Sequence, residues 1–113
     1  MEKQINYLPL GSVVILKGGI KKLLIVARGL TVNYGDEEKF FDYGASDYPM
    51  GIIGDQLAYF NHDAITKVVF EGFSDDDDKV VVDNINRFIA ENKVVRVSNE
   101  ELEKAGKGNG INN

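Results

Sequence analysis

Few residues in this chain have the types and spacing that catalysis requires, and the first to consider is its single histidine. His62 precedes Asp63, and a histidine oriented by a carboxylate is a common general base. Neighbours on one turn rarely face each other, however, and the chain has no Gly-x-Ser-x-Gly elbow or other nucleophile motif. We therefore expect a structural role for His62, no catalytic residue and no enzymatic activity.

The acidic run at 75–78 is a second group with chemical potential. Carboxylates bind hard cations, but an EF-hand counted from Asp75 would need glycine and glutamate where this chain has Val80 and Asn86. The run also follows Ser74 and precedes apolar residues at helical spacing, where the positive end of a helix favours aspartates. The sequence thus predicts a solvated helix start, with no metal site and no cofactor.

A small basic group lies in and after the first predicted hairpin and consists of Lys17, Lys21, Lys22 and Arg28. On a small β-module such a group can contact RNA. The whole chain has 18 acidic and 13 basic residues and a net charge of −5, which opposes binding to phosphate backbones. This balance favours a protein or peptide partner and leaves RNA binding as a weaker alternative.

Length and composition indicate one small domain. A chain of 113 residues buries one modest core, which we expect to be formed by residues 1–105, with 106–113 as a disordered tail. The absence of cysteine excludes disulfides, thiolate catalysis and cysteine-ligated metals. No apolar run reaches the roughly 18 residues of a membrane span and no signal peptide begins the chain, so we expect a cytoplasmic protein without membrane insertion.

The elements that must position these residues follow from apolar runs and turn residues. Gly18 and Gly19 between two β-branched runs predict a hairpin with strands at about 12–17 and 20–28. Further strands are expected at 30–34, 39–43 and 66–72, a helical turn at 61–65 and an amphipathic helix at 75–92; an edge strand at 94–97 and a short helix from 98 to 105 would follow. The predicted class is α+β, a strongly bent antiparallel sheet of roughly four or five strands that approaches a small barrel. The helix packs across it with one apolar face, made of Val81, Ile85, Phe88 and Ile89.

Aromatic and other apolar residues gather around the segment 44–60, which shows neither helical nor strand periodicity and predicts a long structured loop. Most aromatic side chains of so small a domain belong in its core. Tyrosine and methionine on a loop are nevertheless typical of protein-binding surfaces. The candidate partner-binding residues are Tyr43, Tyr48, Pro49, Met50, Ile53 and Tyr59.

Three blocks of sequence, at 7–19, at 41–43 with 48–54, and at 59–73, give the chain a family resemblance. With their Pro-x-Gly-Ser-Val-Val and Phe-Asn-His-Asp motifs, residues 5–90 resemble small domain-of-unknown-function proteins of Gram-positive bacteria. These proteins are found in type VII (Ess/ESX) secretion loci beside LXG-type toxins.

The resemblance implies a cytoplasmic chaperone or adaptor that binds the helical N-terminal region of a secreted toxin and assists its targeting. It carries no catalytic motif. An immunity protein that neutralises a cognate toxin is the alternative, since an acidic surface suits a basic nuclease. The sequence leaves the oligomeric state and the binding face open.

Overall fold

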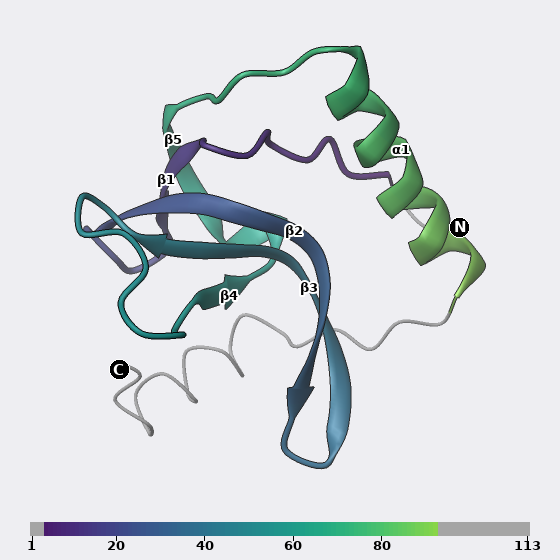
Figure 1. Ribbon diagram of the computed structural model, residues 1–113, viewed down its shortest axis with the longest axis horizontal. Coiled ribbons are helices and arrows are strands. Elements are labelled where there is room, and N and C mark those ends of the chain that lie inside the picture. Colours follow the sequence, from purple (N-terminus) through teal and green to yellow (C-terminus); the bar gives the residue numbers. More distant parts are fainter. Residues whose placement is uncertain (1–3, 93–113) are drawn as a thin grey trace.

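A computed structural model describes residues 4–92, which form an antiparallel sheet and one helix (Figure 1). The elements are β1 (Val13–Leu16), β2 (Lys22–Tyr34), β3 (Glu37–Asp47), β4 (Ala58–Phe60), the short 3₁₀ turn η1 (His62–Ala64), β5 (Ile65–Phe70) and α1 (Asp76–Glu91). The five strands lie in the order β4-β3-β2-β1-β5, and all neighbours are antiparallel. The predicted α+β class is confirmed, as an open sheet with β4 and β5 at its edges and not as a closed barrel.

The β1–β2 hairpin forms where the glycine pair predicts it. Gly18 has a φ of +80°, and the N–H of Gly19 donates to the carbonyl of Leu16 at 3.0 Å. The hairpin places Val14 and Ile25 in the core, where their exposed fractions are 0% and 1%. Burying β-branched side chains on a pleated surface is the main stabilisation available to such a hairpin.

The β2–β3 hairpin is longer than the sequence predicts, because β3 continues through residues that resemble a turn. Gly44 lies inside β3, and a Cβ built on it would sit 3.3 Å from Leu30 Cδ1 and 3.5 Å from Ala27 Cβ. Gly44 therefore permits close packing within the sheet and makes no turn. The expected loop at 44–60 begins only after Asp47, and β4 interrupts it at its end.

Both strands of this hairpin bend midway, which turns its far end away from the rest of the sheet (Figure 1). Gly29 lies in this part of β2 with a φ of +60°, and a Cβ there would lie 3.1 Å from two atoms of the Ile85 side chain. Only glycine combines this backbone conformation with room for the helix. Gly29 therefore lies in the bent part of β2 and also next to the helix.

The helix α1 is confirmed within one residue at each end, whereas its predicted buried face is partly wrong. Val81 and Phe88 are 42% and 46% exposed, although Phe88 stacks on Phe40 at a centroid distance of 6.3 Å. The residues that face the sheet are Val82, Ile85, Asn86 and Ile89. The helix is rotated towards Asn86 because this amide has a hydrogen-bonding partner in the N-terminal segment.

That N-terminal segment, residues 5–12, packs into the domain, and Tyr7 within it is only 3% exposed. Asn86 accepts from the N–H of Ile5 at 2.9 Å and donates to its carbonyl at 2.8 Å. Further on, Gly11 N–H donates to the Ile25 carbonyl, and Ile25 N–H donates to the Ser12 carbonyl. The segment is thus fixed to the helix at one end and to β2 at the other.

The acidic run starts α1, as the sequence predicts. The N-cap is Asp75, whose carboxylate accepts from the N–H of Asp78 at 3.1 Å. Ser74 instead donates its hydroxyl to the Asp78 carboxylate at 2.9 Å. The expected edge strand at 94–97, the helix at 98–105 and the tail at 106–113 lie outside the described residues. Within 4–92, no helix has the length and apolar character needed to cross a membrane.

Replacing Ile89 by alanine tests the observed helix face. Ile89 is 4% exposed, so Ile89→Ala should lower the free energy of unfolding by about 2–5 kcal/mol through lost burial and a cavity. The half-exposed Val81 is the control, and Val81→Ala should cost less than about 1 kcal/mol. Urea denaturation followed by circular dichroism measures both, and equal losses would contradict docking through Ile89.

Candidate functional site

The loop after β3 and the β1–β2 turn together present an exposed apolar surface, which we name the apolar tip. Its members are Ile20, Tyr48, Pro49, Met50, Ile52 and Ile53. Ile20 is 94% exposed, Met50 71% and Ile53 57%. The loop and the turn lie at the left of Figure 1, at the end of the sheet opposite α1. Apolar side chains gathered in this way are typical of a surface that another molecule covers.

The base of the apolar tip is fixed by polar contacts on both sides of the loop. Tyr48 N–H donates to the Lys22 carbonyl at 3.2 Å, and Gly51 N–H donates to the Asp47 carbonyl at 2.8 Å. Lys21 forms an ion pair with Asp47 at 3.2 Å, and the Lys22 ammonium lies 5.8 Å from the centre of the Tyr48 ring. These contacts hold the backbone while the apolar side chains point outwards.

Four predicted partner-binding residues, Tyr48, Pro49, Met50 and Ile53, lie together at the tip. Two others do not. Tyr43 is fully buried, and half-buried Tyr59 packs on Phe41 with 5.5 Å between ring centres. Ile20 also belongs to the tip, although the sequence does not predict it there. Its signal was an isoleucine directly after a glycine pair, at a turn position where polar residues are usual.

A buried carboxylate organises the interior beneath η1. Asp42 is 1% exposed, and its carboxylate accepts from the Tyr7 hydroxyl and from the His62 backbone N–H, each at 2.7 Å. The Asp42 backbone N–H donates in turn to the side-chain oxygen of Asn61 at 3.2 Å. Hydrogen bonds of this kind offset the cost of removing a charge from water.

The His62 ring belongs to the same interior. Its Nδ1 lies 2.8 Å from the Tyr43 hydroxyl, whose oxygen already accepts from the Leu8 N–H at 2.9 Å. The Tyr43 hydroxyl therefore links the His62 ring to the N-terminal segment. Burial raises the pKa of Tyr43 to about 12. The geometry gives the His62 ring a positioning role, with Nδ1 engaged by Tyr43.

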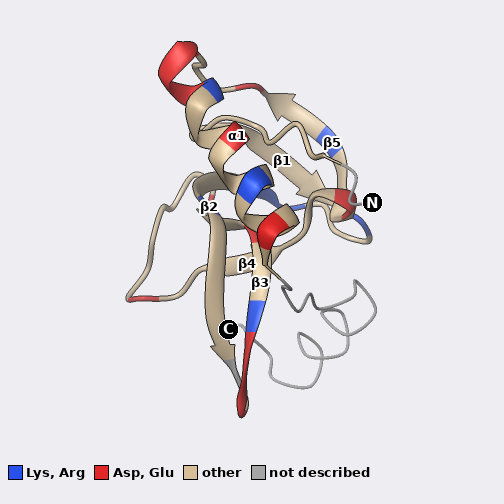
Figure 2. Cartoon of the chain, turned by 90° about the vertical axis from the view of Figure 1, so that its right-hand side faces the viewer, with Lys and Arg blue, Asp and Glu red and all other residues tan. Residues whose placement is uncertain are grey.

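The basic group expected to contact RNA does not form one surface. The Arg28 side chain is 5% exposed, pairs with Asp78 at 2.7 Å and donates to the Leu8 carbonyl at 3.2 Å. Lys21 is engaged by Asp47 at the base of the tip. Basic residues in the described part of the chain are dispersed among acidic ones (Figure 2).

The acidic run has structural partners as well. Asp75 caps α1, and Asp78 accepts from both Arg28 and Ser74. Within residues 4–92, no group of three or more histidine, cysteine, aspartate or glutamate side chains is arranged to hold a metal ion.

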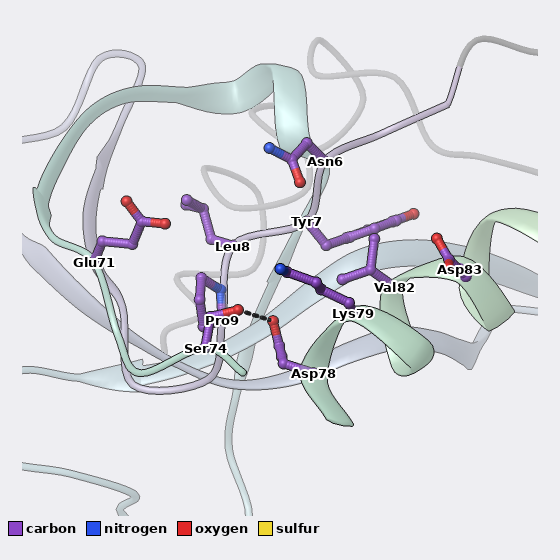
Figure 3. A pocket seen from close by; sticks show the side chains of 10 residues that line it. All are labelled: Asn6, Tyr7, Leu8, Pro9, Glu71, Ser74, Asp78, Lys79, Val82 and Asp83. Carbon is purple, nitrogen blue, oxygen red and sulfur yellow. Dashed lines mark hydrogen bonds between the residues drawn. The ribbon is translucent and has the colours of Figure 1, made fainter. Parts of the chain in front are cut away.

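Two hollows flank the N-terminal segment. The first, of about 460 Å³, lies between this segment and the start of α1, and Figure 3 shows charged side chains of both signs around it, with the Ser74–Asp78 hydrogen bond at its wall. The second, of about 510 Å³, lies towards η1 and β5 and is lined by His62 and Lys67 among others. Asn6 and Leu8 line both hollows, so the segment is the wall between them.

The fold and the tip define a small α+β domain with a preformed apolar surface. The chain belongs to the family described as Domain of unknown function (DUF4176), whose model matches residues 7–81. The expected likeness to a domain-of-unknown-function family is thereby confirmed at that level. No curated protein and no solved structure matches the chain.

The raised pKa of Tyr43 predicts a specific alkaline loss of stability. Its value in the fold is about 12 against 10.0 for the free side chain, so the folded state holds the proton more tightly. The associated stability is complete below pH 10 and declines as the pH rises towards 12, by up to about 3 kcal/mol. The free energy of unfolding, measured by urea titration between pH 9 and about 12, should therefore fall more steeply in the wild type than in Tyr43→Phe.

Other tyrosines and the lysines titrate over the same range, and comparison with Tyr43→Phe removes their common contribution. Tyr59→Phe is the matched control, because Tyr59 is only half-buried. Its slope should follow the wild type. Parallel curves for Tyr43→Phe and the wild type would contradict the assignment.

Proposed function

We propose that this protein is a non-enzymatic adaptor or chaperone that binds a type VII-secreted toxin of the LXG type and assists its targeting to the secretion machinery. The observation that carries the proposal is the apolar tip. Large apolar side chains such as Met50 and Ile53 are more than half exposed there, on a backbone held by hydrogen bonds and an ion pair. The family resemblance supplies the identity of the partner.

The composition of the tip suits a helical partner such as the N-terminal region of the toxin. An amphipathic helix docks by laying an apolar stripe against an apolar surface. Met50 is flexible and adapts to the shape of the stripe, whereas Tyr48 offers a large contact area with few rotatable bonds. The fixed loop base lowers the entropy lost on binding.

A second candidate function, an immunity protein, is favoured by the net charge of −5. Acidic proteins associate rapidly with basic nucleases through long-range attraction. The two functions differ in what happens to the toxin. An adaptor leaves the bound toxin active, whereas an immunity protein abolishes its activity. The RNA-binding alternative depends on four basic residues, and it is weakened because one of them, Arg28, is buried in an ion pair with Asp78.

A pull-down of the tagged protein from its native cytoplasm, followed by mass spectrometry, identifies the partner. We expect stoichiometric recovery of an LXG-type protein that retains its toxic activity in the complex. Loss of that activity on binding would instead indicate immunity. Recovery of RNA without such a toxin would contradict both.

Binding measurements on the purified pair then test the surface. The double substitution Met50→Glu with Ile53→Glu places charges at the centre of the tip and should weaken binding at least about tenfold, measured by isothermal titration calorimetry. The matched control is Val80→Glu, since Val80 is 56% exposed on α1. Equal affinity of the double variant and the wild type would exclude the tip as the binding surface.

A further inference from the structure

The N-terminal segment is bound to the domain in the way that a peptide ligand is bound. Asn86 forms two hydrogen bonds with the backbone of Ile5, accepting from its N–H at 2.9 Å and donating to its carbonyl at 2.8 Å. Leu8 is held similarly, because its N–H donates to the Tyr43 hydroxyl at 2.9 Å and its carbonyl accepts from Arg28 at 3.2 Å. Side chains of the helix and the sheet thus recognise the backbone of two residues in the segment.

Tyr7 is the anchor side chain of this arrangement. It is 3% exposed, its ring packs edge-on against Tyr43 with 5.6 Å between ring centres, and its hydroxyl donates to the Asp42 carboxylate at 2.7 Å. Two apolar side chains of the segment, Ile5 and Leu8, are partly buried against the same core. The segment therefore combines a buried aromatic anchor with flanking apolar contacts, as short peptides bound in grooves do.

A single turn connects this segment to β1. The Ser12 N–H donates to the Pro9 carbonyl at 3.2 Å, and Gly11 inside the turn has a φ of +88°. A glycine with positive φ at the third position is typical of a type II turn. Leu10, before the glycine, is 49% exposed. Opening this turn would release the segment from the domain while β1 stays in the sheet.

The segment also has open space on both sides. Hollows of about 460 Å³ and about 510 Å³ flank it, and Asn6 lines both of them. Figure 1 shows the segment as an extended trace that crosses from α1 to β1, and Figure 3 shows the hollow between it and the start of α1. Another chain of the same sequence can therefore take its place without a rearrangement of the sheet or the helix.

The surface that holds residues 5–8 contains Arg28, Asp42, Tyr43 and Asn86, and we name it the segment site. We propose that a second copy of this chain supplies residues 5–8 to this site, so that two copies exchange their N-terminal segments and form a dimer.

The contacts identify a second copy as the occupant, because residues 5–8 of this chain are the sequence that the segment site fits. Every contact of the segment is repeated in the exchanged dimer, and only the turn at 9–12 changes. Protein concentration then decides between monomer and dimer. The segment site contacts α1, whereas the apolar tip lies at the opposite end of the sheet (Figure 1), so the proposal does not depend on the proposed function.

Cross-linking between chains that carry one cysteine each tests the exchange. Asn6 and Asp83 line the same hollow, and the chain has no cysteine of its own. Chains with Asn6→Cys and with Asp83→Cys are unfolded together in urea, refolded at high concentration and treated with a short bismaleimide. A heterodimer, identified by mass, then joins position 6 of one copy to position 83 of the other.

The control pair for this experiment combines Asn6→Cys with Asp55→Cys, since Asp55 is exposed in the loop after β3. The yield of the 6–83 heterodimer should exceed that of the control pair at least about tenfold, because thiols held at one hollow react at a high effective concentration.

A substitution in the turn shifts the balance between monomer and dimer. A β-carbon disfavours the positive φ of Gly11 in the closed turn, whereas the opened connection is free to adopt another conformation. Gly11→Ala should therefore raise the ratio of dimer to monomer in sedimentation equilibrium at least about fivefold. The matched control is Gly54→Ala, because Gly54 has a φ of +64° in the loop after β3 and equally open surroundings. It should leave the ratio unchanged.

A synthetic peptide of residues 4–11 competes for the segment site. In excess over the protein it should lower the yield of the 6–83 heterodimer at least about fivefold. The same peptide with Tyr7→Ala lacks the anchor and should leave the yield unchanged.

Three results would overturn the exchange. The first is a wild type and a Gly11→Ala variant that both stay monomeric up to millimolar concentration. The second is a dimer whose 6–83 yield does not exceed that of the control pair, because its interface then lies elsewhere. The third is a monomer that binds the peptide and forms no heterodimer, since the segment site would then serve a different protein.

Discussion

The buried carboxylate of Asp42 imposes a constraint that much of the structure satisfies. A charge removed from water is tolerated only where donors surround it. The donors come from far along the chain: the Tyr7 hydroxyl precedes Asp42 by 35 residues, and the His62 N–H follows it by 20. The N-terminal segment, β3 and η1 are therefore held together by one residue, and Tyr7, Asp42 and His62 all lie within the 7–81 match to the family.

Arg28 and Gly29 join the helix α1 to the rest of the fold, as Asp42 joins the N-terminal segment, β3 and η1. The Arg28 guanidinium contacts the Leu8 carbonyl and the Asp78 carboxylate, which joins β2 to the N-terminal segment and to the first turn of α1. Gly29 provides the space that the Ile85 side chain occupies. Arg28 thus binds the first turn of the helix through an ion pair, and Gly29 leaves room for the helix to pack against β2. The bent sheet, the segment and the helix converge here because polar and steric requirements are met by adjacent positions.

The parts of the fold that follow from local pattern were predictable, and those that follow from distant contacts were not. The glycine pair fixes the first hairpin, and the acidic run with the apolar spacing behind it fixes α1. The helix face was misjudged because the position of Asn86 depends on Ile5, 81 residues away. The sequence predicts Gly44 in a loop because nothing adjacent in sequence reveals that Leu30 packs over it.

In the candidate site, too, local sequence predicts some residues, whereas the placement of others depends on distant contacts. Tyr43 is among the predicted partner-binding residues, yet it is buried and its hydroxyl has one partner at Leu8 and another at His62, neither of which the sequence places nearby. The composition of the loop alone predicts four residues of the tip, because a loop rich in turn-forming residues buries few side chains. These residues are Tyr48, Pro49, Met50 and Ile53. Ile20 joins them only because Lys21 and Lys22 bring its turn against the loop. A surface assembled from two turns becomes visible only once the sheet register is known.

The composition of the core and the net charge explain how the protein tolerates its exposed apolar tip. The core takes Phe40, Phe41, Tyr43 and Phe60, so the apolar tip is not a remnant of incomplete packing. A net charge of −5 opposes indiscriminate association between copies. General repulsion therefore allows a small acidic domain to keep an apolar surface exposed without indiscriminate self-association.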